Sequence, residues 1–472
     1  MTKESLLFCA SEVYPFAKTG GLADVAHSLP RALLDSYELK VVMPLYSSVD
    51  RKKYSIKSLK KSFSISMNNI DYEVELFGCK YEGLEYIFIY SALLCDREFL
   101  YGTATSGYAD NALRFAIFCR SVVELLRVKS YTIIHLNDWQ TALVPLFLQE
   151  ESEINTKTLF TIHNLAYQGV FSYETLKEIA IDSKYFTIDV LEFYGQMNFM
   201  KAAIAYSDAI TTVSQSYADE ILTARFGCGL DGFLISHKNK LTGIINGIDS
   251  EHFTPSKDKL LEYPFTNLTQ KKLNKKSYLK EKNLKGITKP LFIFIGRFTE
   301  QKGVDLLIDS LEQIATNDCN IAILGDGEEK YQEKILEIVN IYDNIHFEFK
   351  YNEVLSHQMY ASADFLLMPS LFEPCGLNQM IAMSYGAIPI VHKVGGLKDT
   401  VNDYKLFDNE SSNGYGILFE EALNDSLIDS FNEALALYST KKDYNKIVKH
   451  NMLCDFSWKN SAKLYDKLYK QL

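Results

Sequence analysis

The chain has 472 residues, a length that favours two large domains or about three ordinary ones over a single core. Its apolar fraction of 47% and charged fraction of 23% are typical of packed globular proteins, which excludes a disordered or fibrous chain. Lys and Arg number 49 against 60 Asp and Glu, so the net charge of −11 argues against nucleic acid and anionic membranes as partners, and an anionic ligand needs a local cluster of positive groups.

The first half of the sequence alternates short apolar runs with helical patterns. Leu6 to Ala10 predicts a buried strand, and a helix is predicted from about Leu22 to Leu34 after a loop with paired glycines. The same reasoning predicts a helix over 141–149 and further strands at 39–43, 131–136, 159–162 and 209–213. Strands that alternate with helices form parallel sheets, with polar residues just past the carboxyl ends of the strands.

A polar, Lys-rich segment follows Asn246-Gly247-Ile248-Asp249 and is interpreted as the crossing into a second domain. From Pro290 the alternation restarts. It predicts strands at 291–295, 320–324, 345–350, 365–368 and 388–391, separated by helices at 304–315, 328–342, 354–361 and 376–385. The last segment, 458–472, has an apolar face opposite Lys side chains and predicts an amphipathic closing helix.

These elements predict an α/β fold of two Rossmann-like, doubly wound domains. The N-terminal domain is predicted to cover 1–252 and the second domain 253–455. Two parallel sheets in tandem are expected to face one another across a cleft, and ligands of open sheets bind beyond the strand ends.

The eight cysteines are scattered, with no Cys-x-x-Cys pair and no His at zinc-like spacing, which is typical of reduced thiols in a cytoplasmic protein. The N-terminal apolar run is too short for a signal peptide, and no apolar stretch is long enough for a membrane span.

Three glycine turns follow predicted strands. Lys18-Thr19-Gly20-Gly21 precedes a helix whose N-terminal N–H groups, together with the Lys18 charge, can cradle a phosphate. Arg297 and Lys302 flank the second turn and can converge on one polyphosphate, although a solvated helix start explains that pair equally well. Gly395-Gly396-Leu397 is the third. The G-x-G-x-x-G fingerprint of dinucleotide sites is missing, so NAD is not indicated.

Other polar residues also stand past strand ends. Glu373 can cap a helix or accept hydrogen bonds from sugar hydroxyls. Cys375 has no His beside it in sequence, so a buried thiol is favoured over a nucleophile. Asp138 and His163 follow neighbouring strands, which moves the balance modestly from a structural role to a functional one.

Together these residues resemble the glycogen and starch synthase family of glucosyltransferases, which have the two-domain GT-B architecture. The resemblance covers essentially the whole chain, and its most specific parts are Lys18 to Leu22 and Glu373 to Gln379. It also includes the segments Asn137-Asp138-Trp139, Thr161-Ile162-His163-Asn164, Asn246-Gly247-Ile248-Asp249, Arg297 to Gly303, Pro369 to Gly386 and Gly395-Gly396-Leu397.

The resemblance implies retaining transfer of glucose from ADP-glucose to the non-reducing 4-hydroxyl of an α-1,4-glucan, without a metal or other cofactor. It makes the first domain, 1–252 completed by the C-terminal helix 456–472, the acceptor side and the second domain the nucleotide-sugar side. It implies catalytic roles for Glu373, His163, Arg297, Lys302 and Asp138, and substrate-binding roles for Lys18, Gly20, Gly21, Asp24, Asn164, Asn246, Cys375, Gly376 and Leu377.

Within that resemblance, Lys18 contacts the donor phosphates, His163 lies near the glucose 6-hydroxyl and the reacting carbon, and Glu373 binds the sugar hydroxyls. Asp138 stands near the donor sugar and the acceptor, and Cys375 lines the donor pocket. Departure of the nucleoside diphosphate requires stabilisation of negative charge, which positive groups and a helix end supply. With no evident nucleophile, a front-face reaction is expected.

The sequence departs from the family pattern at three positions, and a fourth, Ile381, departs only from the wider GT-B group. Gln140 replaces the usual His, Leu371 a commoner Arg, and Phe253 a frequent Trp. Ile381 stands where the wider GT-B group has a second Glu, and glycogen synthases of this type commonly lack that Glu. These changes bear on donor preference and acceptor fit.

Three alternatives stay open. Another retaining GT-B transferase would use UDP-glucose or a small sugar acceptor, and Lys18 to Leu22 argues against it. An inactive glucan-binding scaffold would not need to retain Lys18, His163, Arg297, Lys302 and Glu373. A phosphorylase would need a pyridoxal phosphate lysine site, which is not evident.

Overall fold

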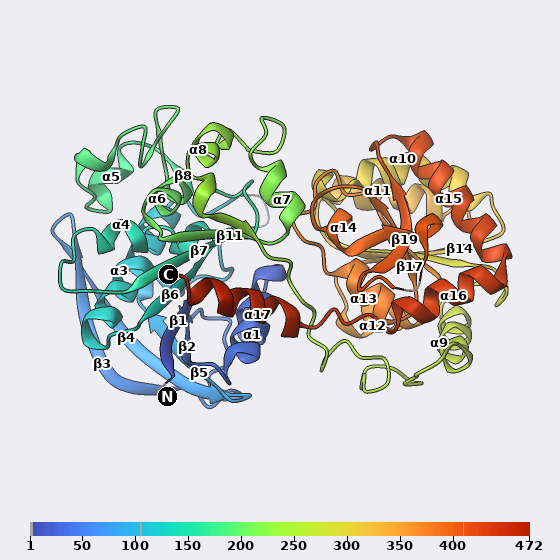
Figure 1. Cartoon of the computed structure of the whole chain (residues 1–472), viewed down its shortest axis with the longest axis horizontal. Helices are drawn as coiled ribbons and strands as arrows, with labels where there is room; N and C mark the ends of the chain where they lie inside the picture. The colour runs from blue at the N-terminus through green and yellow to red at the C-terminus, as the bar shows by residue number, and fades with distance from the viewer. Residues whose placement is uncertain (1–2, 104–105, 409) are drawn as a thin grey trace. The chain divides into compact units, whose positions relative to one another are not determined.

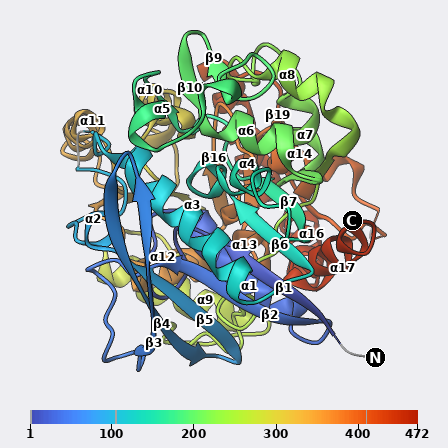
Figure 2. The same cartoon turned by 90° about the vertical axis from the view of Figure 1, so that its left-hand side faces the viewer.

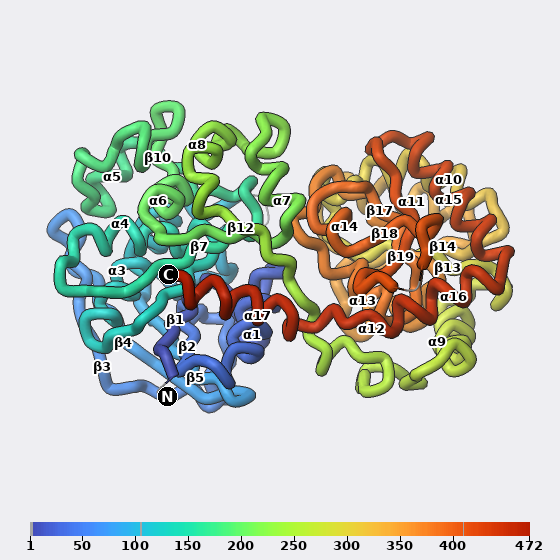
Figure 3. Tube along the Cα trace, in the orientation of Figure 1, coloured from blue at the N-terminus to red at the C-terminus, as the bar shows by residue number. Residues whose placement is uncertain are grey.

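The structure, a computed structural model, describes residues 3–103, 106–408 and 410–472. This part of the chain divides into two compact units, shown as a ribbon in Figure 1 and as a tube in Figure 3. Unit 1 comprises the described residues of Met1–Val213, Ala218–Ile244 and Trp458–Leu472, and unit 2 comprises those of Ser214–Tyr217 and Ile245–Ser457.

Unit 1 is built on one mixed sheet with the strand order β12-β11-β7-β6-β1-β2-β5-β4-β3. Its strands are β1 (Glu4–Cys9), β2 (Tyr37–Pro44), β3 (Lys57–Met67), β4 (Ile70–Tyr81), β5 (Leu84–Tyr90), β6 (Ile133–Asn137), β7 (Lys157–Ile162), β11 (Ala209–Thr212) and β12 (Leu241–Gly243). Neighbours from β12 to β5 pair in parallel, whereas β5, β4 and β3 pair antiparallel. Figure 2 shows these three strands side by side, in blue.

The antiparallel end of this sheet was not predicted. The outer strand β3 is mostly exposed, and its Lys60 and Lys61 face solvent, as expected of an edge strand protected by charge. By contrast, β1 runs through the middle of the sheet with Leu6 paired to Leu39 on one side and Ile133 on the other. A strand buried on both faces reads as a continuous apolar run, which is why its prediction succeeded.

The register of β6 and β7 brings two predicted site residues together. Asn137, the last residue of β6, pairs with Thr161 of β7, so Asp138 and His163 leave the sheet at the same edge. The sequence placed both residues at strand ends, and the parallel register makes them neighbours.

The helices of unit 1 cover the sheet and the loops at its edge. They are α1 (Gly21–Leu33), α2 (Ala92–Cys95), α3 (Asn111–Val128), α4 (Val144–Leu148), α5 (Thr175–Glu178), α6 (Phe199–Tyr206), α8 (Asp231–Ser236) and α17 (Trp458–Tyr469), with α7 (Gln215–Glu220) at the unit boundary in sequence and short 3₁₀ turns η1 (Trp139–Thr141), η2 (Ser183–Tyr185) and η3 (Lys238–Lys240). A small antiparallel sheet is formed by β8 (Val170–Phe171), β10 (Gln196–Asn198) and β9 (Glu192–Phe193).

The closing helix α17 packs against α1, as Figures 1 and 3 show. Its buried face ends in Tyr469, whose hydroxyl lies 2.6 Å from His135 Nδ1 in β6. The hydroxyl of Tyr37, at the start of β2, donates to Asp466 of α17 at 2.9 Å. These contacts fasten the last helix to the sheet of unit 1.

The predicted helix over 141–149 is wrong in extent. The chain forms the 3₁₀ turn η1 and then the short α4, which has Pro145 in its first turn. Proline has no N–H to donate, so it suits the first turn of a helix and disfavours one already in progress.

Unit 2 contains a parallel sheet with the order β15-β14-β13-β16-β17-β19-β18. Its strands are β13 (Leu291–Ile295), β14 (Asn320–Gly325), β15 (Ile345–Phe349), β16 (Phe365–Met368), β17 (Ile388–His392), β18 (Val401–Asp403) and β19 (Gly414–Phe419). The central strands are buried along their whole length, which is typical of a sheet covered on both faces by helices.

The helices of unit 2 include three that the sequence analysis missed, at 268–281, 424–439 and 441–451. They are α9 (Leu268–Glu281), α10 (Val304–Ala315), α11 (Glu329–Val339), α12 (Glu353–Ser362), α13 (Asn378–Ser384), α14 (Gly395–Thr400), α15 (Asn424–Ser439) and α16 (Lys441–Asn451), with the turns η4 (Glu300–Lys302) and η5 (Tyr404–Leu406). None of the described helices, in either unit, is long and apolar enough for a membrane crossing.

One of the missed helices, α9, lies within the Lys-rich segment that was interpreted as the crossing between domains, and it packs against α12. Lys271 is buried and donates to the carbonyl oxygens of Tyr360, Ala361 and Tyr385 at 2.7–3.3 Å. Lys275 is also buried and forms an ion pair with Asp364 at 2.5 Å. Two lysines of the apparent linker are therefore core residues, which a hydropathy pattern cannot reveal.

Candidate active site

The loop Lys18-Thr19-Gly20 leads from β1 into α1 and is held by the buried carboxylate of Glu12. Glu12 Oε2 accepts hydrogen bonds from the Thr19 backbone N–H at 2.7 Å and from the Thr19 hydroxyl at 2.6 Å. Its other oxygen accepts the Gly20 N–H at 3.2 Å. These two N–H groups are thus already bonded, and a phosphate at this helix end would meet the N–H groups from Gly21 onward.

The charge on Glu12 is set by its surroundings. Burial raises the pKa of Glu12 from its ordinary value of 4.5 to about 7, although the hydrogen bonds from Thr19 and Gly20 act in the opposite direction. The group that positions the predicted phosphate loop therefore titrates near neutral pH.

Lys18 and Asp24, both predicted to bind substrate, form an ion pair. Lys18 Nζ lies 2.8 Å from Asp24 Oδ1, and the two side chains are 41% and 31% exposed. A pair this exposed contributes little to stability because water screens it. Its effect is on position, since Asp24 in the first turn of α1 directs the ammonium toward the start of that helix.

His163 is held as a neutral side chain with a defined tautomer. Asn137 donates through Nδ2 to the Cys9 carbonyl at 2.9 Å, which leaves its Oδ1 to accept from His163 Nε2 at 2.9 Å. The proton must then be on Nε2, so Nδ1 carries the lone pair. Burial lowers the pKa of His163 to about 3, and the ring stays uncharged at neutral pH.

Asp138 has a strained backbone and a perturbed carboxyl group. Its φ of 57° places a non-glycine residue in the left-handed region. Its Oδ1 accepts the His163 N–H at 2.8 Å. Burial raises the pKa of Asp138 to about 7, with the backbone hydrogen bonds from His163 and Asn164 acting against it. Strain and a shifted pKa at one residue are typical of a functional position.

In unit 2, Lys302 and Glu373 form a largely buried ion pair. Lys302 Nζ lies 2.5 Å from Glu373 Oε2, and the same oxygen accepts the Ser370 hydroxyl at 3.0 Å. The side chains are 20% and 7% exposed. The sequence predicted functional roles for both residues but did not predict that they pair. Lys302 was expected to converge with Arg297 on a phosphate, and in this structure its ammonium instead contacts the carboxylate, while Arg297 is exposed.

Tight backbone packing fixes the turns around this pair. Gly303 has a φ of 66°, and a Cβ on it would lie 2.0 Å from the Pro369 carbonyl oxygen. Gly396 packs equally closely against the backbone of Cys375, since a Cβ added to Gly396 would lie 2.1 Å from the Cys375 carbonyl oxygen. The Gly396 N–H also donates to the Glu373 carbonyl at 3.0 Å. Both glycines are thus required for the turns to meet.

Cys375 is a buried thiol, as the sequence favoured. Burial raises its pKa to about 12, although a backbone hydrogen bond from Asn246 lowers it. A thiol with such a pKa is not a nucleophile at neutral pH.

The remaining predicted binding residues lie in turns of their own unit. Asn246 is buried, and its Oδ1 has no hydrogen-bond partner within the described chain. Gly376 adopts a φ of 71°, and Leu377 is the residue that precedes the first turn of α13. In unit 1, Asn164 Oδ1 accepts the Ala166 N–H at 3.0 Å. Their contacts with substrate stay predictions.

The positions that depart from the family pattern have distinct surroundings. The side chain of Gln140 is buried, and its Oε1 lacks a hydrogen-bond partner among the described residues. Leu371 is half-buried and donates its N–H to the Gln301 carbonyl at 2.9 Å. Ile381 is buried in α13. Phe253 stacks on His357, with ring centroids 4.9 Å apart.

From the sequence, no role in the site was assigned to Glu12, Asn137 or Ser370, although Asn137 and Ser370 lie within the segments that carry the family resemblance. Glu12 and Asn137 stand at or just past the ends of β1 and β6, where Asp138 and His163 were found. A search of every strand end for polar residues would have included both. Ser370 gave no comparable signal, because its role depends on the position of the Glu373 carboxylate.

Comparison with known proteins matches each of the two units to a family. Residues 5–236 match the family described as "Starch synthase catalytic domain", and residues 275–451 match "Glycosyl transferases group 1". The chain is 42% identical to a glycogen synthase of Geotalea daltonii over 98% of both chains, and 43% identical to a glycogen synthase of Aquifex aeolicus over 99% of both.

Solved structures of similar proteins support the same family and fold. The catalytic domain of starch synthase IV from Arabidopsis thaliana, bound to ADP and acarbose, has a TM-score of 0.92 and 31% identity, covering 100% of this chain and 99% of that one. A sucrose-phosphate synthase from Thermosynechococcus elongatus, at 17% identity and a TM-score of 0.63 over 99% of both chains, shares the fold. The predicted GT-B fold, with two Rossmann-like domains, and the resemblance stated from the motifs are confirmed. The chain belongs to the glycogen and starch synthase family of glycosyltransferases.

Proposed function

We propose that this chain transfers glucose from ADP-glucose to the non-reducing 4-hydroxyl of an α-1,4-glucan such as glycogen, with retention at the anomeric carbon. Family membership supports the reaction class, and the ADP and acarbose bound to the Arabidopsis starch synthase support a nucleotide-sugar donor and a glucan acceptor. The single structural observation that carries the proposal is the buried Lys302–Glu373 ion pair.

The pair suits transfer from a nucleotide sugar because its two members have opposite tasks. As ADP leaves, negative charge grows on its terminal phosphate, and an ammonium already desolvated beside that phosphate stabilises the charge strongly. The carboxylate, held in place by Lys302 and Ser370, accepts hydrogen bonds from sugar hydroxyls. We assign further phosphate contacts to Lys18 and Arg297.

The reaction then needs no enzyme nucleophile. The bond between glucose C1 and the phosphate oxygen breaks, the acceptor oxygen bonds to C1 from the same face, and the departing phosphate takes the acceptor's hydroxyl proton. Glu373 is a poor nucleophile here because Lys302 neutralises it and Ser370 donates to it. Neutral His163 offers a lone pair on Nδ1 to a sugar hydroxyl, and Asp138 orients His163 through its backbone N–H.

We keep the division into an acceptor-side domain, 1–252 with 456–472, and a donor-side domain, 253–455, as part of this proposal. We also keep a cytoplasmic location, which the scattered cysteines support: all eight are free thiols and most are buried.

The test measures nucleotide release with glycogen present, comparing ADP-glucose with UDP-glucose at matched concentrations. We expect ADP-glucose to have the higher kcat/KM. A preference for UDP-glucose would favour the alternative GT-B transferase. Glycogen binding without nucleotide release from either donor would favour a glucan-binding scaffold. A covalent glucosyl-enzyme trapped on any carboxylate would contradict the front-face reaction.

A further inference from the structure

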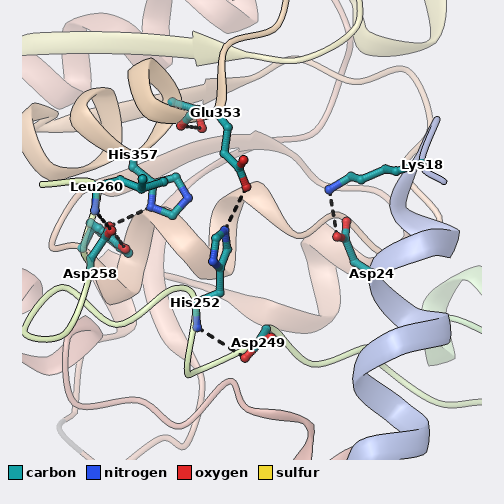
Figure 4. A network of polar contacts seen from close by, with 10 residues as sticks. Lys18, Asp24, Asp249, His252, Asp258, Leu260, Glu353 and His357 are labelled. Atoms are coloured by element: carbon teal, nitrogen blue, oxygen red, sulfur yellow. Dashed lines mark hydrogen bonds and ion pairs between the residues drawn. The ribbon is translucent and has the colours of Figure 1, made fainter. Parts of the chain in front are cut away.

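A cluster of metal-ligating side chains in unit 2 takes no part in the proposed glucosyl transfer. His252, Glu353 and His357 each present one ligand atom, and these atoms lie within 4.8 Å of one another. Figure 4 shows the imidazole of His252 and the carboxylate of Glu353 close to the ring of His357.

Two of these residues come from consecutive turns of one helix. Glu353 and His357 are four residues apart in α12, so their side chains lie on the same face. The helix start is fixed by Asn352, whose side chain accepts the Leu355 N–H at 3.1 Å. His252 comes from the segment after Asp249, near the start of unit 2, and its Nε2 lies 3.1 Å from Glu353 Oε1.

The contact with Asp258 defines the tautomer of His357. His357 Nδ1 lies 2.7 Å from Asp258 Oδ2, which also accepts the Tyr385 hydroxyl at 2.6 Å, and Asp258 Oδ1 accepts the Leu260 N–H at 2.9 Å. Because the Asp258 carboxylate also accepts hydrogen bonds from Tyr385 and Leu260, we assign Nδ1 of His357 as a donor to Asp258, which leaves the lone pair of His357 on Nε2.

The lone pair on His357 Nε2 accepts no hydrogen bond from the described residues. The side chain of His357 is only 1% exposed, and Nε2 has no hydrogen-bond partner in the part of the chain that the structure describes. A buried polar atom without a partner costs free energy, so such an atom in a native protein calls for an explanation. Figure 4 shows this nitrogen on the side of the ring that faces His252 and Glu353.

The ring of His357 is also held rigidly. Phe253 stacks on it at 4.9 Å with an interplanar angle of 17°, and His252 meets it edge-on at 4.9 Å and 77°. A carboxylate that accepts from one imidazole nitrogen while the other faces a cation is the usual arrangement behind a zinc-ligating histidine.

We propose that His252, Glu353 and His357 bind one Zn²⁺ ion, with Asp258 orienting His357. Two imidazoles and one carboxylate form a ligand set that Zn²⁺ accepts, whereas Mg²⁺ and Ca²⁺ prefer oxygen ligands alone. Four-coordinate Zn²⁺ with bonds of about 2.1 Å sets its ligand atoms roughly 3.4 Å apart. In the structure these atoms lie up to 4.8 Å apart, so they must move closer to bind one ion. Glu353 can make this movement because its side chain is 47% exposed, and water completes the coordination.

Such an ion ties the segment 249–258 to α12. That segment begins beside the Asn246-Gly247-Ile248-Asp249 motif, where the Asp249 side chain accepts the Glu251 N–H at 2.9 Å. We assign the ion a structural role: it replaces the His252–Glu353 hydrogen bond by stronger bonds and satisfies His357 Nε2.

The experiment uses the full chain without a histidine tag, stripped of metal by a chelator. Binding of Zn²⁺ is measured by competition with a chromophoric chelator, and Co²⁺ is added separately as a spectroscopic probe of tetrahedral coordination. We expect one equivalent of Zn²⁺ per chain, a rise in Tm on Zn²⁺ addition, and no such rise with Mg²⁺. His252→Gln and Glu353→Gln should each weaken Zn²⁺ binding at least about tenfold.

The matched control is His450→Gln, which changes a histidine of the same unit whose Nε2 lies 3.1 Å from the Asn413 carbonyl oxygen. It should leave Zn²⁺ affinity within about twofold of the wild type. His357→Gln is less suitable, because it also removes a partner of the buried Asp258 and can unfold the unit. Absence of stoichiometric Zn²⁺ binding, or equal affinity in the wild type and in both His252→Gln and Glu353→Gln, would overturn the proposal.

Discussion

Lys302 Nζ lies 2.5 Å from Glu373 Oε2, and this contact joins the loop after β13 to the loop after β16. The two residues are 71 positions apart in sequence, and their strands are adjacent in the sheet of unit 2. The pair therefore links the stability of this unit to its proposed chemistry, and the two can be measured separately.

For stability, Lys302→Met should lower the free energy of unfolding by roughly 3 kcal/mol, because it leaves the buried Glu373 carboxylate without its counter-ion. The double variant Lys302→Met/Glu373→Gln should recover part of that loss. Denaturant unfolding of the single and double variants gives the coupling energy. The control is Lys393→Met, which breaks the exposed Lys393–Glu420 pair and should cost less than about 1 kcal/mol. Equal losses in Lys302→Met and Lys393→Met would contradict this account.

For catalysis, Lys302→Ala should lower kcat with ADP-glucose by at least about 10²-fold under conditions where the variant stays folded, since it removes charge stabilisation from the transition state. Glu373→Ala should lower kcat by a comparable factor through the loss of sugar positioning. Initial rates of ADP release, with circular dichroism as the check on folding, measure both. Rates like those of the wild type in either variant would refute the assigned role.

His163 should act without changing its charge. A pKa of about 3 keeps the ring neutral from pH 5.5 to 9, so His163→Ala should lower kcat by roughly 10²-fold yet leave the limbs of the pH profile in place. The control is His237→Ala, a histidine of the same unit whose Nδ1 lies 2.9 Å from the Phe233 carbonyl oxygen and which has no assigned role. Disappearance of a pH limb in His163→Ala would show that this histidine titrates during catalysis.

Glu12 should make the stability of the protein depend on pH. The folded state binds a proton at Glu12 more tightly than the unfolded state, so this contribution is fully present below pH 4.5 and is lost as the pH rises through about 7. The change corresponds to at most about 3 kcal/mol. Between pH 5 and 8 the wild type should thus lose stability relative to Glu12→Gln, while the exposed-site control Glu150→Gln should run parallel to the wild type. A difference between wild type and Glu12→Gln that does not vary with pH would contradict the raised pKa.

Alanine substitutions at Gly303 and Gly20 should distinguish a glycine needed for folding from a glycine needed for donor binding. Gly303→Ala should cost at least about 2 kcal/mol, because the new Cβ meets the Pro369 carbonyl at a positive φ. Gly20→Ala meets only ordinary contacts, the nearest at 3.7 Å, so it should leave stability within about 0.5 kcal/mol and raise the KM for ADP-glucose about tenfold. The control Gly232→Ala has open space around its Cβ and lies in a helix, where Ala is preferred by about 0.5–1 kcal/mol. An unchanged KM in Gly20→Ala would remove this turn from the donor site.

The buried lysines of α9 should behave as core residues. Lys271→Met removes the donor for three carbonyl oxygens and should cost roughly 3 kcal/mol, whereas Lys272→Met, at the next and exposed position, should change stability by less than about 0.5 kcal/mol. Denaturant unfolding of the two variants makes the comparison. Similar stabilities would mean that this segment is a linker, as its composition alone indicates.

Much of the secondary structure of this protein is determined by local sequence. Apolar runs such as Leu291–Ile295 and the amphipathic spacing in 304–315 depend on residues close together in the chain, so strands, helices and the two-sheet fold could be predicted. The glycine turns and the Glu373-Pro374-Cys375-Gly376 segment likewise indicated the family, because their conformations and chemistry are local.

Only the tertiary structure decided how the polar groups are paired and charged. The Lys302–Glu373 pair, the Glu12 clamp on the Lys18 loop, the neutral ring of His163 and the cluster of His252, Glu353 and His357 all join residues brought together by folding. A pKa depends on burial and on neighbours within a few ångströms, and neither can be read from hydropathy along the chain. The sequence thus determined which side chains are present at the strand ends, and the fold decided which of them meet.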